Sequence, residues 1–386
     1  MAAKRPRHKA SKRSRSLSLK RTAVRGRVAA YDVARGIGII LVVIGHSLTM
    51  DTYARAFIYT FHIPLFFIIS GAVMRPANLQ GLRGFAMMRA LIHSERKLLT
   101  EYLFYSLCFM LYDVVIRVKW LHEFGKRDLM WDVYKTITLC GINVLWFVIT
   151  LAVAKIITSW LVSKMAGTAP RLLTSTAIYL VFAWLGQYAG LHVDETSRSQ
   201  WLYYPMVAFF EIMTMSAFVL LGQTVRATLP SVLKRWGWAF PMLIIPNVFL
   251  CQFAGTTDYH LLNPGFPPLS FALAITGSLA VFGIGELIGK TFVLYRIFKW
   301  YSTNSLLVMV THEYLLLGRF FVAPAVTRLA TRYVALPWLP TYMMLLLLLE
   351  VPVCMMLRPP SDKVIATAIA IADGWSRPRT ARHAKL

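Results

Sequence analysis

The chain has 386 residues, of which 57% are hydrophobic and only 15% are charged, and its mean hydropathy is +0.56. Soluble domains carry about 25% charged residues, so lipid is the expected solvent for most of this chain. The composition excludes a soluble globular domain, a disordered chain and a collagen-like repeat.

Four cysteines lie inside or beside apolar runs and show no Cys-x-x-Cys spacing; they are Cys108, Cys140, Cys251 and Cys354. So few cysteines exclude a disulfide scaffold. Small apolar side chains in a helix bundle account for all four. We therefore expect neither a metal site nor a redox site.

Ten segments are long and apolar enough to cross a bilayer, which takes about 20 helical residues. In chain order they are 33–50, 56–74, 99–117, 142–163, 172–191, 204–222, 236–254, 269–289, 303–323 and 337–357. Lipid offers the backbone no hydrogen-bonding partners, and the alternating strands of a closed barrel are absent from the sequence. We expect an all-α integral membrane protein, a bundle of about ten transmembrane helices without internal repeats or a second domain.

Basic residues are distributed unevenly over the two sides of such a bundle. Of the 42 Lys and Arg, 30 fall on the side that holds both termini, nine fall on the opposite side, and three lie within segments. Cytoplasmic loops carry the excess of Lys and Arg. Both termini are therefore predicted to be cytoplasmic.

The two ends of the chain differ from the rest. Residues 1–31 contain eleven Lys or Arg and no acidic residue, which is typical of a disordered tail on anionic lipid headgroups. No aromatic platform accompanies the basic run, so we expect no nucleic-acid partner. The first apolar run is long enough to span, so no cleavable signal peptide is expected. The predicted organisation is a basic cytoplasmic tail (1–31), a polytopic membrane domain (32–357) and a second basic cytoplasmic tail (358–386).

The first segment carries ionisable side chains, which cost about 2.5–3.5 kcal/mol each at the centre of a membrane helix and so mark candidate functional sites. Asp32 and Arg35 are three residues apart, share a helix face and can pair. His46 follows Arg35 by eleven residues, which is about three turns, so it lies on the same face roughly 16 Å further along.

Two more histidines and a carboxylate fall at a depth similar to that of His46. They are His62 in the second segment, His312 in the ninth, with Glu313 beside it, and Glu211 in the sixth. A single membrane histidine more often makes an interhelical hydrogen bond. Several ionisable groups at one level, above an arginine on the same face, favour a functional site.

Three motifs stand in the first two segments: Asp32-x-x-Arg35-Gly36, the spacing of Arg35 and His46, and the run from Phe61-His62-Ile63-Pro64 to Ser70-Gly71. Leu145-Trp146-Phe147 and the stretch from Asn304-Ser305-Leu306 to Thr311-His312 follow later. Together they resemble the membrane acyltransferase-3 family, and within it the fucose 4-O-acetylase-like branch. The resemblance covers residues 31–357. Glu211 departs from it, because an apolar or small residue is expected there.

The resemblance implies ten helices in the plasma membrane, the inner membrane of a bacterium, and O-acylation of a sugar. The donor would be a cytoplasmic acyl-CoA, either acetyl-CoA or succinyl-CoA, used as a co-substrate without any bound cofactor. The acceptor would be an exported polysaccharide, a lipopolysaccharide, a lipo-oligosaccharide or a lipid-linked precursor. The expected partners are this donor, this glycan and membrane lipids.

The distribution of ionisable residues suits binding of the donor at the cytoplasmic end of the helix bundle. Phosphates of acyl-CoA favour Arg and Lys, and Arg35 with Asp32 stands at that end. The next inner loop adds four cations that are equally explained as ordinary cytoplasmic charges: Arg83, Arg89, Arg96 and Lys97.

A sugar hydroxyl needs a base that removes its proton during attack, and histidine is the usual group. We assign His46 as this base, and His62 and His312 as residues that orient it or stabilise the oxyanion. Pocket-wall or acceptor residues are expected at Trp146, Glu211, Asn304 and Ser305. No serine lies in a nucleophile elbow and no Cys–His pair is evident, so the sequence does not support an acyl-enzyme.

Two other functions fit part of the pattern. A glycan transporter or flippase would use the histidines as a proton relay, and a scaffolding membrane subunit would use them structurally. The absence of inverted repeats from the sequence disfavours the transporter.

Overall fold

A computed structural model describes residues 29–49, 51–123, 125–193, 199–315, 317–332 and 337–376. Within these ranges all regular elements are helices, and one isolated bridge pairs Asp258 with Asn263. The predicted all-α class is therefore confirmed. Residues 1–28, which make up most of the predicted N-terminal tail, and residues 377–386 at the end of the predicted C-terminal tail lie outside the described residues.

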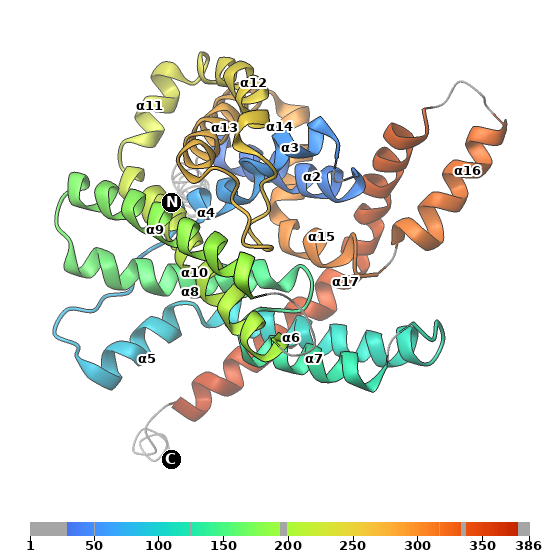
Figure 1. The fold of residues 1–386 in the computed structure, drawn as a ribbon, viewed down its shortest axis with the longest axis horizontal. Helices are drawn as coiled ribbons and strands as arrows, with labels where there is room; N and C mark the ends of the chain where they lie inside the picture. Colours follow the sequence, from blue (N-terminus) through green and yellow to red (C-terminus); the bar gives the residue numbers. More distant parts are fainter. Residues whose placement is uncertain are drawn as a thin grey trace, which may run out of the picture.

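The elements follow in chain order (Figure 1). The first half of the chain forms α2 (Ala29–Ser47), α3 (Tyr53–Tyr59), α4 (His62–Val73), α5 (Gly84–Ser94), α6 (Arg96–Tyr112), a π-helical turn η1 (Asp113–Val118), α7 (Lys126–Ile137), α8 (Leu145–Lys164) and α9 (Thr168–His192). The second half forms α10 (Gln200–Val225), α11 (Leu229–Trp236), η2 (Phe240–Leu243), α12 (Ile244–Ala254), α13 (Pro267–Ile288), α14 (Phe292–Thr303), α15 (Ser305–Thr311), η3 (Gly318–Val322), α16 (Ala323–Arg332) and α17 (Trp338–Ser376).

Eight helices in the described part of the chain are long and apolar enough to cross a membrane. They are Ala29–Ser47, Tyr53–Val73, Arg96–Val118, Leu145–Lys164, Thr168–His192, Gln200–Val225, Pro267–Ile288 and Trp338–Asp373. A ninth span results if the bent pair of Leu229–Trp236 and Phe240–Ala254 crosses as one unit, with an angle of 94° between its halves. The protein is thus a multi-pass membrane protein, and a count of about ten spans stays a prediction.

The predicted span at 303–323 is wrong as a single continuous helix. α15 ends at Thr311, a turn follows, and the chain resumes as η3 at Gly318. The segment is apolar on average, but its polar residues Asn304, Glu313 and Tyr314 have partners on other elements. Glu313 and Tyr314 lie in this turn, where they contact His46 of α2 and Asp113 of η1.

The last helix is longer than predicted. Instead of ending near residue 357, α17 continues to Ser376, although Pro359 and Pro360 lie within it. The first part of the predicted C-terminal tail is therefore helical. Arg96 at the start of α6 pairs with Asp373 at 2.9 Å and ties this extension to the bundle.

Glycines allow the helices around α2 and α4 to pack closely. α4 and α10 are in contact through Gly71 and Gly222, and a Cβ at either position would lie 2.0 Å from a backbone oxygen of the other helix. A Cβ at Gly36 of α2 would lie 2.1 Å from the carbonyl oxygen of Phe298 in α14. Small residues permit such contacts in membrane bundles, and here they determine where the first two motif-bearing helices lie.

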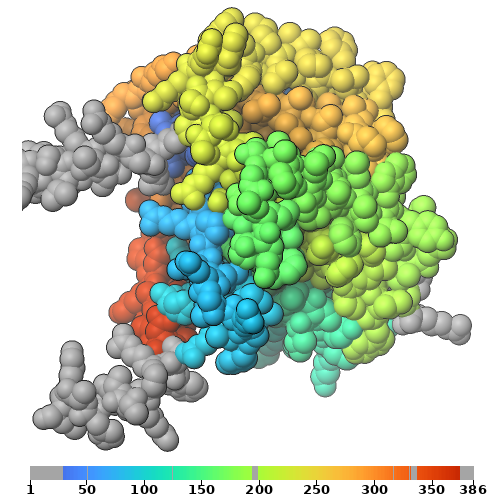
Figure 2. All heavy atoms as spheres, turned by 90° about the vertical axis from the view of Figure 1, so that its left-hand side faces the viewer, coloured from blue at the N-terminus to red at the C-terminus, as the bar shows by residue number. Residues whose placement is uncertain are grey.

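α5 is not part of this packed core. Figure 2 shows it on the surface, between α9 (green) and the C-terminal part of α17 (red). Most of its side chains are exposed, among them Phe85, Met88 and Ile92. Of the four cations predicted to crowd this inner loop, only Lys97 lines a cavity next to Arg35.

Candidate active site

Two cavities adjoin the motif-bearing helices. The Arg35 cavity, about 620 Å³, is lined by Arg35 and Ile39 of α2 and by residues from α4, α6, α8, α15 and α17. The His46 cavity, about 540 Å³, is lined by His46 near the other end of α2. Two predicted site residues that share one helix face thus open into separate spaces.

The wall between the cavities is thin. On α4, Ile63 lines the His46 cavity and Phe66 lines the Arg35 cavity, a separation of three residues or about 4.5 Å along the helix. On α8, the neighbours Trp146 and Phe147 face the two cavities in the same way. The rings of Phe66 and Phe147 meet edge to face at 5.6 Å. A long, narrow group in one cavity therefore needs to pass only about one layer of side chains to reach the other.

His46 is held by a carboxylate. Its Nδ1 lies 2.8 Å from Oε2 of Glu313, in the turn that follows α15. A carboxylate accepts the Nδ1 proton, so this contact favours the tautomer whose Nε2 carries the lone pair. His46 is thereby oriented as histidine bases commonly are, with one ring nitrogen on an acid and the other available to substrate.

His312 packs against His46. The two rings meet edge to face, with centroids 5.1 Å apart. The Nδ1 of His312 lies 3.0 Å from the carbonyl oxygen of Val308, and its buried Nε2 has no hydrogen-bond partner among the described residues. His312 itself lines neither cavity, although Met309 lines the Arg35 cavity and Glu313 lines the His46 cavity. Its place in the site rests on the ring contact with His46.

His62 also reaches this region, as its predicted depth implied. It is buried, lines the His46 cavity, and donates from Nδ1 to the carbonyl oxygen of Ile58 at 2.9 Å. The ring of Tyr59 covers it at 4.7 Å. The structure thus brings together the three histidines singled out in the sequence.

Glu211 pairs with a fourth histidine, His260, which lines the His46 cavity. Its buried carboxylate accepts a hydrogen bond from Nδ1 of His260 at 2.6 Å, and the ring of His260 stacks on Trp146 at 5.1 Å. Burial alone lowers the pKa of His260, but the Glu211 carboxylate outweighs it, so the pKa lies above the ordinary 6.5. Glu211 does not line the His46 cavity, whereas its partner His260 does; the carboxylate beside His46 is Glu313.

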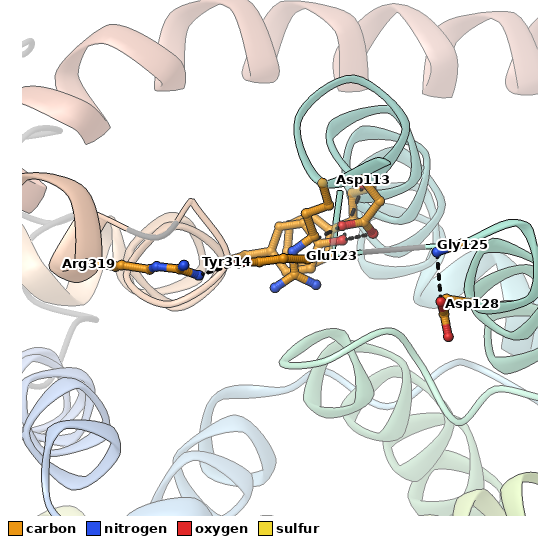
Figure 3. A network of polar contacts seen from close by, with 8 residues as sticks. Asp113, Glu123, Gly125, Asp128, Tyr314 and Arg319 are labelled. Carbon is orange, nitrogen blue, oxygen red and sulfur yellow. Dashed lines mark hydrogen bonds and ion pairs between the residues drawn. The ribbon is translucent and has the colours of Figure 1, made fainter. Parts of the chain in front are cut away.

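A polar cluster also lines the His46 cavity, and it consists of Asp113, Arg117, Asp132 and Tyr314. Tyr314 donates a hydrogen bond to Asp113, as Figure 3 shows. Arg117 lies 3.5 Å from the same carboxylate. Burial raises the pKa of the neighbouring Asp132 to about 7, and the charge of Asp113 adds to the effect. Carboxylates, a guanidinium and a phenol in one cavity can accept and donate hydrogen bonds to several hydroxyl groups of one ligand.

Of the two donor residues predicted at the other end of α2, Arg35 lines the Arg35 cavity and Asp32 does not. Asp32 is buried and accepts a hydrogen bond from Tyr295 at 3.3 Å. Asn304 and Ser305 line the Arg35 cavity, rather than the cavity of Trp146 and His46. Asn304 accepts a hydrogen bond from Arg358 at 2.8 Å. Of the predicted acceptor-side residues, Trp146 thus lines the His46 cavity and Glu211 lines neither cavity.

Three groups could hold a metal ion. Potential ligand atoms of His46, His312 and Glu313 lie within 4.8 Å of one another, and two imidazoles with one carboxylate are a ligand set that zinc accepts. The close contact between His46 and Glu313 already satisfies two of these atoms without an ion. The expectation of a metal-free site stays a prediction.

Several residues of the two cavities were not singled out from the sequence. Asp113 could have been found, because an acid in an apolar segment is costly. His260, Asp258 and Arg55 lie in or next to loops, where polar residues are ordinary, so no local signal identified them. Their relevance follows only from the cavity that they share.

The sequence model of the acyltransferase-3 family, which describes an acyltransferase domain, matches residues 28–358. No curated protein and no solved structure matches the chain significantly. The match takes in every element from α2 to α16 and α17 as far as Arg358, including every residue of the His46–Glu313–His312 cluster. The chain therefore belongs to the acyltransferase-3 family and is an acyltransferase.

Proposed function

We propose that the protein is a membrane O-acyltransferase that moves an acetyl or succinyl group from acyl-CoA in the Arg35 cavity to a sugar hydroxyl in the His46 cavity. The supporting observation is the thin wall between the cavities, with His46 and His312 beside it. In this arrangement the thioester approaches from one side and the hydroxyl from the other. The fucose 4-O-acetylase-like branch, acting on an exported glycan or a lipid-linked precursor, fits this division.

In the proposed step the sugar oxygen attacks the thioester carbonyl while Nε2 of His46 takes the hydroxyl proton. Collapse of the tetrahedral intermediate breaks the carbon–sulfur bond, and the CoA sulfur leaves with the proton returned by His46. No acyl-enzyme is formed. Glu313 positions the base and stabilises its protonated form.

His62 and His312 have supporting roles in this proposal. In both, a backbone carbonyl accepts from Nδ1, so the neutral ring presents Nε2 as an acceptor. Either histidine can orient the nucleophile by accepting a hydrogen bond at Nε2. To donate a hydrogen bond to the oxyanion, its ring would first have to bind a second proton, at Nε2.

The acceptor side is suited to a sugar. The Trp146–His260 stack offers a flat surface for the C–H face of a pyranose, and Asp132 and Asp258 offer hydrogen-bond acceptors for its hydroxyl groups. Such a mixture of aromatic surface and few placed polar groups is typical of small-ligand sites. The His46 cavity does not have to hold the charged CoA, because in this proposal the phosphates of CoA stay in the Arg35 cavity.

The test of this function is release of CoA from acyl-CoA by membranes that contain the protein, together with mass spectrometry of surface glycans from a deletion strain. We expect acyl-CoA consumption to depend on the glycan, and the deletion to remove a mass equal to one acetyl or succinyl group. Glycans that lose export but keep their acylation would instead support a transporter.

Orientation is a separate prediction. The Arg35 cavity should face the cytoplasm, with both termini on that side, because 30 of the 42 basic residues fall there. A reporter that works only in the cytosol should be active when fused after Leu386. Activity of a periplasm-only reporter at the same position would overturn the orientation.

Arg35 should affect donor affinity more than turnover. Arg35→Lys keeps the charge but loses the planar fork that binds phosphate in two places. We expect the KM for acyl-CoA to rise about tenfold, the order of one hydrogen bond to a charged group. An unchanged KM in Arg35→Ala, with normal protein abundance, would remove Arg35 from the donor site.

A further inference from the structure

A third cavity, about 480 Å³, adjoins the Arg35 cavity. It lies between α14 and α17, and the two cavities share Thr303, Asn304 and Arg358. Its own lining adds Arg296, Lys299 and Trp300. A ligand that fills the Arg35 cavity and is too long for it can therefore continue into this space.

The lining of this cavity is strongly basic. It contains Arg296, Lys299 and Arg358 and no carboxylate. Within the described part of the chain, no carboxylate pairs with Arg296 or Lys299; Arg296 lies over the ring of Phe292 at 5.4 Å and Lys299 over the ring of Tyr295 at 5.1 Å. Cations without acidic partners around one hollow favour an anionic ligand.

Arg358 is held at the border between the two cavities. Its guanidinium donates to Oδ1 of Asn304 at 2.8 Å, and Asn304 in turn donates to the carbonyl oxygen of Trp300 at 2.8 Å. The exposed Asp362 lies further away, at 3.4 Å. The hydrogen bond with Asn304 fixes the direction of the arginine, so its remaining donors can serve a ligand that passes from one cavity into the other.

We propose that this cavity binds the nucleotide end of the donor, with Arg296 and Lys299 on the 3′-phosphate of CoA and Trp300 beside the adenine. The assignment rests on the proposed function, which places the thioester arm and the pyrophosphate in the Arg35 cavity. A phosphate monoester carries up to two negative charges and suits two adjacent unpaired cations. The ring of Trp300 in the same cavity offers a stacking surface for the adenine, because every nucleobase has a flat face on which an aromatic side chain can stack.

Phosphate esters can also come from lipid headgroups, and an experiment can distinguish the two sources. Purified protein in neutral-lipid nanodiscs is titrated with CoA and with 3′-dephospho-CoA, so that no acyl group and no acceptor are needed. We expect wild type to bind CoA about tenfold or more tightly than 3′-dephospho-CoA, the order expected for a charged hydrogen bond. Arg296→Ala with Lys299→Ala should weaken CoA binding to the level of 3′-dephospho-CoA and leave 3′-dephospho-CoA binding unchanged.

The controls separate this subsite from general charge and from folding. Lys234→Ala with Arg235→Ala removes two basic residues of α11 that line none of the three cavities, and should keep the discrimination. Arg296→Lys with Lys299→Arg keeps both charges and should retain most of the preference for CoA over 3′-dephospho-CoA.

The proposal is overturned if wild type binds both compounds equally. It is also overturned if the double alanine variant still discriminates the two compounds. If that variant in addition loses the thermal stabilisation that nanodiscs containing anionic lipid give the wild type, the cavity is a lipid site. Discrimination without any acyl transfer would preserve the nucleotide site and reject the proposed function instead.

Discussion

His46→Ala should lower acyl transfer by at least about 10²-fold, the typical contribution of a positioned base. His46 is the residue whose Nδ1 is held by Glu313, whose ring touches His312, and whose helix also carries Arg35. Alanine costs less than histidine in a membrane helix, so insertion of α2 should be preserved. The measurement is turnover per purified protein at saturating acyl-CoA, with abundance and thermal stability recorded alongside.

The matched control is His192→Ala. His192 is an exposed histidine at the end of α9 that lines neither of the two main cavities, and its loss should leave turnover unchanged. His62→Ala and His312→Ala should also reduce turnover, by smaller or more variable factors. Near wild-type transfer in His46→Ala, together with an inactive His312→Ala, would assign the base to His312.

Glu313→Gln should be almost as damaging, although it changes little in shape. The carboxylate can only accept from Nδ1 of His46, whereas an amide can also donate to it and so stabilise the tautomer with the proton on Nε2. That tautomer cannot act as a base. A comparable change in serine-protease triads costs about 10⁴-fold, and because Glu313 is partly exposed we expect about 10²-fold or more here.

The loss in Glu313→Gln should appear in turnover, while the KM for acyl-CoA stays unchanged, because the proposed site for the donor phosphates is the Arg35 cavity, which Glu313 does not line. Glu286→Gln is the control, since Glu286 pairs with Lys290 and lines neither main cavity. Turnover within twofold of wild type in Glu313→Gln would show that the contact with His46 has no catalytic role.

The membrane class, the candidate helices and the relation of Arg35 to His46 could all be predicted from the sequence. Hydropathy and composition are sums over neighbouring residues, and helical periodicity relates positions within one segment. For the same reason His46, His62 and His312 could be placed at one depth, and the structure brings them together. The prediction of a continuous helix at 303–323 was wrong, because a segment's average hydropathy hides its few polar residues. Asn304, Glu313 and Tyr314 have partners on other elements.

The sequence by itself therefore determined that this is a helical membrane protein with an arginine and a histidine three turns apart on one helix face. Only the tertiary structure decided which groups surround them. Glu313 reaches His46 through a turn, His260 brings Glu211 to Trp146, and Arg358 reaches Asn304 from another helix. Each of these pairs joins elements far apart in the chain. Their contacts depend on how the helices pack, which no local pattern of residues contains.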